Sequence, residues 1–386
     1  MSRGKRRISA VFFLLLIVLI LHMTAWGGEI SQGELPGIED LGLEKIQEFL
    51  DERGELGGLS FSGLMEELAQ GNWQQAAERL FQGLRYELFT KNGDSIRFLS
   101  QAAALGILGA VFSQAAAVFP SSKVSETGFF ITYLLTFTCL TASFFTSVET
   151  AEAVVNHSLE FMRVLLPSFF LAVALAGGSI SGAALYSSVI AGVSAADFLC
   201  GKVLLPLIKV YVLLILAGNL SREPLISRMT SFLESGIKWT LKTVTGLFLG
   251  FQLIQSMILP FADSVKRAGI QKAVSLIPGI GSGAEAVLQV AVGSGVLLKN
   301  TMGGAAVAVL VILAAAPMIK LFVFFLLYRG AAALMEPVCD KRLTACAEGM
   351  AKAHGLLLSL AAAQILFFAV SIGIVCSATN AVYFGG

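Results

Sequence analysis

Long apolar runs constrain this chain more than any single motif does. A helix that crosses a bilayer needs about 20 largely apolar residues in a row, and several runs of that length are present. Of all residues 56% are hydrophobic and 14% charged, whereas a soluble domain carries about 25% charged residues. The sequence therefore predicts an all-α polytopic membrane protein. The clearest predicted spans cover residues 96–119, 128–148, 243–262, 303–328 and 354–377.

The first residues predict a secretory signal peptide over residues 1–27. Four basic residues precede the apolar run 10–21, and Ala25 and Gly27 provide small residues at positions −3 and −1 of a cleavage site. An uncleaved signal anchor is the alternative. The apolar run is short for a membrane span, so we expect cleavage after Gly27.

Residues 28–95 predict a small helical ectodomain. This segment holds 14 acidic and 5 basic residues, and it follows the predicted signal peptide, which places it outside the cytoplasm. Helical spacing of apolar residues predicts one helix over 43–50 and another over 72–90, with Asn72 as the N-cap of the second. We expect the apolar stripe of this ectodomain to rest on the membrane or on a partner.

A shift of the chain by 111 residues superposes several uncommon residues within the apolar region. This joint match predicts an internal duplication, with repeat 1 over residues 160–262 and repeat 2 over residues 271–377. Two transmembrane helices over residues 96–150 would precede the repeats. The matched pairs are Pro167 with Pro278, Pro206 with Pro317, and Lys209 with Lys320.

Each predicted repeat starts with a Gly/Pro-rich hairpin that either crosses the membrane twice or re-enters it. In repeat 2 this segment covers residues 276–300 and includes "GIGSGA". A phosphate-binding loop of this kind needs a preceding strand and a βαβ unit, and neither is predicted here. The predicted fold is therefore an internally duplicated helical bundle with such hairpins and a small N-terminal helical ectodomain.

Basic residues concentrate in two connecting segments, 221–242 and 329–352. By the positive-inside rule both are cytoplasmic, so the two repeats run parallel. The same count places an acidic connector around Glu149 and Glu152 outside. It also places the basic residues of 263–302 outside, against the rule. The apolar face of 221–242 predicts a helix that lies in the membrane interface or docks a cytoplasmic partner.

Eight residues are candidates for a pathway or a structural site. Lys209 and Lys320 each follow a proline by three residues, at a depth where a charge faces a cavity or snorkels to the headgroups. The prolines free backbone carbonyls nearby. Glu285 and Lys299 either form an ion pair, with each other or between Glu285 and Lys272, or bind an ion. The full set is Lys209, Lys320, Pro206, Pro317, Pro167, Pro278, Glu285 and Lys299.

No catalytic or cofactor-binding pattern is present. The five cysteines include no CxxC spacing, and the two histidines beyond the signal peptide are too far apart in sequence to predict a metal site. We expect neither an enzyme nor a cofactor. Arg163 and Glu160 are expected to form an interfacial ion pair.

One stretch resembles a known family. The segment "LIPGIGSGAEAVLQVAVGSGVLLKNTMGG" (276–304), with Glu285 and "LLKN" at 297–300, is similar to the signature region of the stage III sporulation protein AE family. The predicted signal peptide, acidic ectodomain and polytopic core match the organisation of that family. The resemblance is specific in 276–330 and weaker elsewhere.

The resemblance implies a mother-cell protein of endospore-forming bacteria, in the membrane around the forespore. Its partners would be other stage III A operon products, namely ring-forming subunits and an ATPase, and forespore stage II sporulation protein Q. They would form a channel that sustains late forespore gene expression; no nucleic-acid partner is implied and a homo-oligomer is left open. The alternative function is a secondary transporter with a substrate site at the repeat hairpins.

Overall fold

The structure is a computed structural model that describes residues 41–53, 60–86, 122–177, 179–219, 227–275, 281–337 and 341–384. The predicted signal peptide 1–27, the predicted span 96–119 and Pro278 lie outside these residues. Every element in the described part of the chain is helical.

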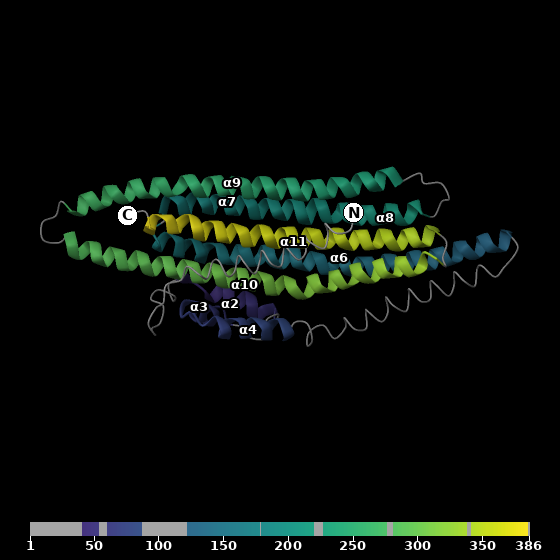
Figure 1. Cartoon of the computed structure of the whole chain (residues 1–386), viewed down its shortest axis with the longest axis horizontal. Helices are drawn as coiled ribbons and strands as arrows, with labels where there is room; N and C mark the ends of the chain where they lie inside the picture. The colour runs from purple at the N-terminus through teal and green to yellow at the C-terminus, as the bar shows by residue number, and fades with distance from the viewer. Residues whose placement is uncertain are drawn as a thin grey trace.

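Five long helical arms form an elongated bundle (Figure 1). They are α6 (Ser122–Leu175), the continuous run of α7 (Ser179–Ala196), η3 (Asp197–Leu204) and α8 (Leu205–Gly218), then α9 (Ser227–Ser275), α10 (Gly281–Met335) and α11 (Lys341–Phe384). Each arm contains a stretch long and apolar enough to cross a membrane. The prediction of an all-α, multi-pass membrane protein is therefore confirmed.

The arms alternate in direction. The connections α8–α9 and α10–α11 lie at one end of the bundle, here called the basic end, while the α6–α7 turn, the α9–α10 connection and the end of α11 lie at the other (Figure 1). The helix arrangement thus agrees with the expectation that 221–242 and 329–352 belong to one side.

Helix α6 differs from the predicted organisation. It runs without interruption from Ser122 to Leu175, so the expected connector around Glu149 and Glu152 is helical and neither residue 150 nor residue 160 is a helix boundary. The turn after α6 needs Gly177, whose φ of 84° lies in the left-handed region that favours glycine.

The glycine-rich stretch of the second predicted repeat is also helical. From Gly281 onward it belongs to α10, so within the described residues it forms no re-entrant hairpin. The α6–α7 turn at Ala176 and Gly177 corresponds, 111 residues later, to positions 287 and 288 inside α10. The two halves therefore differ at this point, and the duplication stays a prediction.

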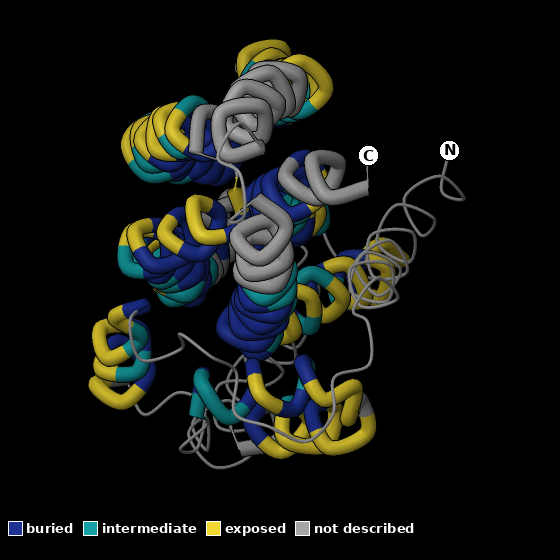
Figure 2. The backbone as a smooth tube through the Cα atoms, turned by 90° about the vertical axis from the view of Figure 1, so that its left-hand side faces the viewer, coloured by how far each residue is buried: buried dark blue, intermediate teal, exposed yellow. Residues whose placement is uncertain are grey.

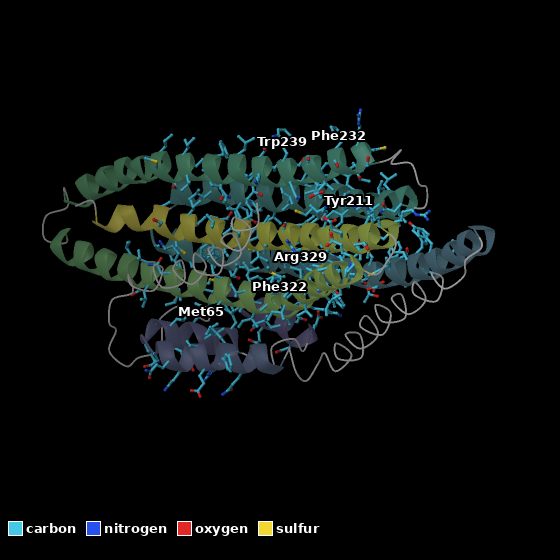
Figure 3. The ribbon with its side chains drawn as sticks, turned by 45° about the vertical axis from the view of Figure 1, so that its right-hand side comes forward. Met65, Tyr211, Phe232, Trp239, Phe322 and Arg329 are labelled. Carbon is cyan, nitrogen blue, oxygen red and sulfur yellow. The ribbon has the colours of Figure 1, made fainter. Side chains whose placement is uncertain are left out.

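The predicted interfacial helix in 221–242 is wrong as a separate element, because residues 227–242 are the first turns of α9. Its apolar residues divide between two environments. Ile237 and Leu241 are buried in the bundle, whereas Met229 and Phe232 are exposed. Phe232 and Trp239 project from the outer side of α9 (Figure 3).

The η3 segment is a π-helix that directly precedes Pro206, which occupies the first turn of α8. Proline has no N–H and its ring collides with the carbonyl four residues earlier. A π turn shifts the hydrogen-bonding partner by one residue, and this widened stretch lets the arm continue through the proline.

Helix α11 occupies the centre of the bundle and packs against α6, α8, α9 and α10. The buried positions of the helices face inward and the exposed positions face outward (Figure 2). Small residues of α10, among them Gly303, Ala305 and Ala306, are buried against the neighbouring helices. Such residues let helix backbones approach closely, as is typical of membrane bundles.

Three short helices precede the bundle: α2 (Glu44–Arg53), α3 (Phe61–Ala69) and α4 (Trp73–Tyr86). Helices α2 and α4 match the two predicted ectodomain helices, whereas α3, capped by Ser60, was not predicted. Helix α3 packs on α10 and α2 packs on α6, where the rings of Phe49 and Phe161 lie 5.7 Å apart. Part of the apolar surface of these helices thus packs on the bundle, whereas Phe81 of α4 is exposed.

Candidate functional site: a buried polar ladder along α11

The inner face of α11 carries polar groups at intervals along an otherwise apolar core. Five residues, which we call the polar ladder, are buried there and contact other arms: Cys346, His354, Gln364, Ser371 and Cys376. At a rise of 1.5 Å per residue the polar ladder extends for about 45 Å.

One member of the polar ladder, His354, has no exposed surface. Its Nδ1 lies 2.8 Å from the carbonyl oxygen of Met350, and its Nε2 lies 2.8 Å from Ser147 Oγ on α6. A carbonyl only accepts, so Nδ1 carries a proton. Ser147 Oγ lies between His354 Nε2 and the carbonyl oxygen of Ser143, which is 3.2 Å away.

Aromatic rings enclose this histidine. Tyr328 of α10 stacks on the imidazole at 4.9 Å, and Phe144 and Phe324 approach it from two other directions. The Tyr328 hydroxyl donates to Ser143 Oγ at 2.6 Å. One cluster therefore joins α6, α10 and α11 through both packing and hydrogen bonds.

Farther from the basic end, Gln364 and Ser371 connect α11 to two other arms. Gln364 Nε2 donates to the carbonyl oxygen of Val155 and to Ser158 Oγ, both on α6, at 2.9 and 2.8 Å. Ser371 Oγ donates to Gln252 Oε1 on α9 at 2.8 Å.

The two ends of the polar ladder involve cysteines. Near the basic end, Tyr133 donates to the carbonyl oxygen of Leu216 and lies 3.4 Å from Cys346 Sγ. At the opposite end, the ammonium of Lys299 donates to the carbonyl oxygen of Cys376 at 2.9 Å. Lys299 is fully buried, so its charge is held inside the bundle.

These contacts tie α11 to α6, α9 and α10 at successive heights. In a bilayer the apolar faces of helices supply little net attraction for one another, and hydrogen bonds between helices favour a particular packing. A shift of α11 along its axis would break several of these bonds at once. The polar ladder therefore fixes the register of the bundle.

The predicted candidate residues Lys209 and Lys320 lie outside the polar ladder. Lys209 Nζ pairs with Glu152 Oε1 of α6 at 2.7 Å, with both side chains about one-third exposed. Glu152 was expected in an external connector. Lys320 lies partly buried on α10. The sequence singled out both lysines as charges within apolar runs but did not predict the partner of the first.

The prolines retain their expected local effect. Pro167 lies inside α6 and Pro317 inside α10, where each removes one backbone N–H from the helix. Pro206 follows the π-helical segment.

The expected pair of Glu285 and Lys299 does not fit the structure. Both residues lie on α10, about 21 Å apart along its axis at 1.5 Å per residue, which two side chains cannot bridge. Lys299 instead bonds the Cys376 carbonyl of α11. Arg163, which was expected to pair with Glu160, has its guanidinium 3.1 Å from the carboxylate of Asp197 in η3.

Sequence reasoning missed the polar ladder as a unit. The usable signal was the occurrence of His354, Gln364 and Ser371 inside one apolar run at spacings of ten and seven residues, which keeps them near one helix face. Among the described residues, no group of three or more His, Cys, Asp or Glu side chains could hold a metal ion.

Comparisons with known proteins agree on one family. The family model described as "Stage III sporulation protein AE" matches residues 59–379. The chain is 23% identical over 342 residues to the stage III sporulation protein AE of Bacillus subtilis (strain 168), a match covering 87% of this chain and 86% of that protein. No solved structure matches.

Proposed function

Since this chain belongs to the stage III sporulation protein AE family, we propose that it is the membrane core of a sporulation channel complex. This complex would link mother cell and forespore and sustain late forespore gene expression. The protein would lie in the mother-cell membrane around the forespore and act without catalysis. Its partners would be the ring-forming subunits and the ATPase of the stage III A operon, and forespore stage II sporulation protein Q.

The observation that carries this proposal is the family match, which extends across the N-terminal helices α3 and α4 and all five arms. The structure supports a scaffold role in two ways. The polar ladder holds the arms in one register, and Lys209 is already paired with Glu152, which leaves that charge engaged within the protein. In this proposal the N-terminal helices, which pack on the bundle, would present their exposed acidic residues to the partners.

A transporter with its substrate site at Lys209 and Lys320 is distinguishable from this scaffold. Lys209→Met alone would strand the carboxylate of Glu152, so the informative variant is the double replacement Glu152→Gln with Lys209→Met. Lys320→Met is examined separately. Each variant replaces the native copy in sporulating cells, and its membrane level serves as the control.

The proposal predicts that both variants support forespore reporter expression and heat-resistant spore formation at near wild-type levels, and that they co-purify with the operon partners. Loss of reporter expression at normal membrane levels and with intact association would contradict it in favour of transport. Failure of the unmodified protein to co-purify with any stage III A product would also overturn it.

A further inference from the structure

The arms containing α7, α9 and α11 come close together at Gly192. A Cβ atom there would lie 2.6 Å from Phe248 of α9 and 2.8 Å from Phe367 of α11. The two rings contact each other edge to face, with centroids 5.2 Å apart. This contact fixes the relative register of the three helices.

One helical turn farther from the basic end, the same inward faces become polar. Because α7 runs antiparallel to α9 and α11, that turn is reached four residues before Gly192 and four residues after each phenylalanine. The residues at these positions are Ser188, Gln252 and Ser371, and all three are buried. Gln255 follows one turn later on α9. We call these four residues the polar layer.

Several polar atoms of this layer have no protein hydrogen-bond partner although they are buried. They are Ser188 Oγ, Gln252 Nε2 and Gln255 Oε1. The single proton of Ser371 Oγ is shared between the carbonyl oxygen of Phe367 at 2.7 Å and Gln252 Oε1 at 2.8 Å. With Oε1 toward Ser371, Nε2 of Gln252 is a donor without a protein partner. The layer thus offers a donor, an acceptor and a hydroxyl that does both.

We propose that the polar layer is a binding site for ordered water inside the bundle. Water accepts from an amide N–H and donates to an amide oxygen, and buried waters make about three hydrogen bonds to groups that otherwise lack a partner. A cation would face the amide donor of Gln252, and an anion would meet no charged group among these four residues. A neutral molecule that both donates and accepts fits the available atoms.

The inference goes beyond the proposed function and does not depend on it. Its first test is magnetisation transfer from water to side-chain nitrogens, measured by solid-state NMR on glutamine-labelled protein in lipid bilayers. Gln364 is the comparison, because its Nε2 already donates to Val155 and Ser158 of α6 and only its Oε1 is buried without a protein partner. Assignments come from the loss of single signals in Gln252→Leu and Gln364→Leu.

We expect magnetisation transferred from water to build up at Gln252 Nε2 several-fold faster than at Gln364 Nε2. If this magnetisation builds up equally slowly at both nitrogens, the polar layer holds no ordered water and the proposal is overturned.

A double-mutant cycle provides a second test if labelling fails. Ser188→Ala and Gln252→Leu should each lower the unfolding midpoint by a few degrees, and their combination should lower it by less than the sum, because both remove partners of the same water. In the Gln252→Leu variant, Ser371 keeps its hydrogen bond to the carbonyl oxygen of Phe367 at 2.7 Å, so its hydroxyl is not left without a partner. Ser187→Ala, an exposed neighbour on α7, is the control. Additive effects, or single variants that raise the midpoint, would contradict bound water.

Discussion

At the scale of single residues, the bundle is defined by polar side chains that an apolar environment forces into specific partnerships. A buried donor or acceptor without a partner costs free energy, so each member of the polar ladder restricts where its neighbouring arm can lie. His354 shows this most fully, since it contacts Ser147 and three aromatic rings at once.

Removing the Tyr328 hydroxyl tests this restriction. Tyr328→Phe keeps the ring stacked on His354 and deletes the hydrogen bond to Ser143, so we expect the free energy of unfolding to fall by about 0.5–1.5 kcal/mol. Titration with a denaturing detergent, followed by circular dichroism, measures it. Tyr186→Phe is the control, because that partly buried tyrosine packs its ring on Phe170. Equal losses in both variants would contradict the role of the hydroxyl.

Lys299 tests whether a buried charge stabilises the bundle or only occupies space. Burying an ammonium is costly even when it is hydrogen-bonded, so Lys299→Met, which preserves much of the side-chain volume, should leave the unfolding free energy unchanged or raise it. Lys299→Ala should lower it by about 2–4 kcal/mol, because it leaves a cavity. The same detergent titration compares them. A large loss in the methionine variant would show instead that the charge itself is required.

At this scale the sequence predicted which charged residues lie within apolar runs but not which residues they contact. Lys209 and Lys320 stand out as charges within apolar runs, and the sequence drew attention to both. Their partners come from other arms, and Glu152 lies 57 positions from Lys209 along the chain. No local pattern specifies such a pairing, because it depends on the register of two packed helices.

At the scale of elements, hydropathy located the apolar stretches of α9, α10 and α11 but not the ends of the helices. The predicted span 128–148 overlaps the membrane-compatible stretch Leu140–Leu175 of α6 only over residues 140–148. Helix α6 continues through Glu149 and Glu152, where the sequence predicted a connector. Hydropathy responds to charge, whereas a helix continues as long as its backbone bonds are satisfied and its charges find partners. Helix α3 was not predicted from the sequence, although Ser60 provides its N-cap.

Glycines at close contacts give a prediction for helix packing. A Cβ atom on Gly295 would lie 2.6 Å from the backbone of Leu175 and Ala176 at the end of α6, and backbone cannot move aside as a side chain can. Gly295→Ala should therefore lower the unfolding free energy by about 1–3 kcal/mol. Gly246→Ala, where no atom lies within 4 Å of the added Cβ, should raise it by about 0.5–1 kcal/mol.

Thermal unfolding of both variants in one detergent measures the contrast. A Gly295→Ala protein as stable as Gly246→Ala would mean that α10 does not approach α6 this closely.

At the scale of the whole molecule, five arms alternate in direction and bring the two basic connections to one end. The shared side of the two basic connections could be predicted from the sequence, because the positive-inside rule depends only on the charges of the connecting segments and not on helix packing. It could not reveal that α11 is central or that α3 lies on α10. Those features follow from which faces carry small and polar residues in three dimensions.

The most direct measurement of this arrangement is labelling of single cysteines by a membrane-impermeant thiol reagent. In a chain without its native cysteines, the exposed positions Ser227→Cys and Glu336→Cys mark the basic end, and the exposed Ala174→Cys marks the opposite end. We expect the first two positions to react only in inside-out vesicles and the third only in intact cells. If Ser227→Cys and Glu336→Cys react from opposite sides, the alternating bundle with a shared basic end is contradicted.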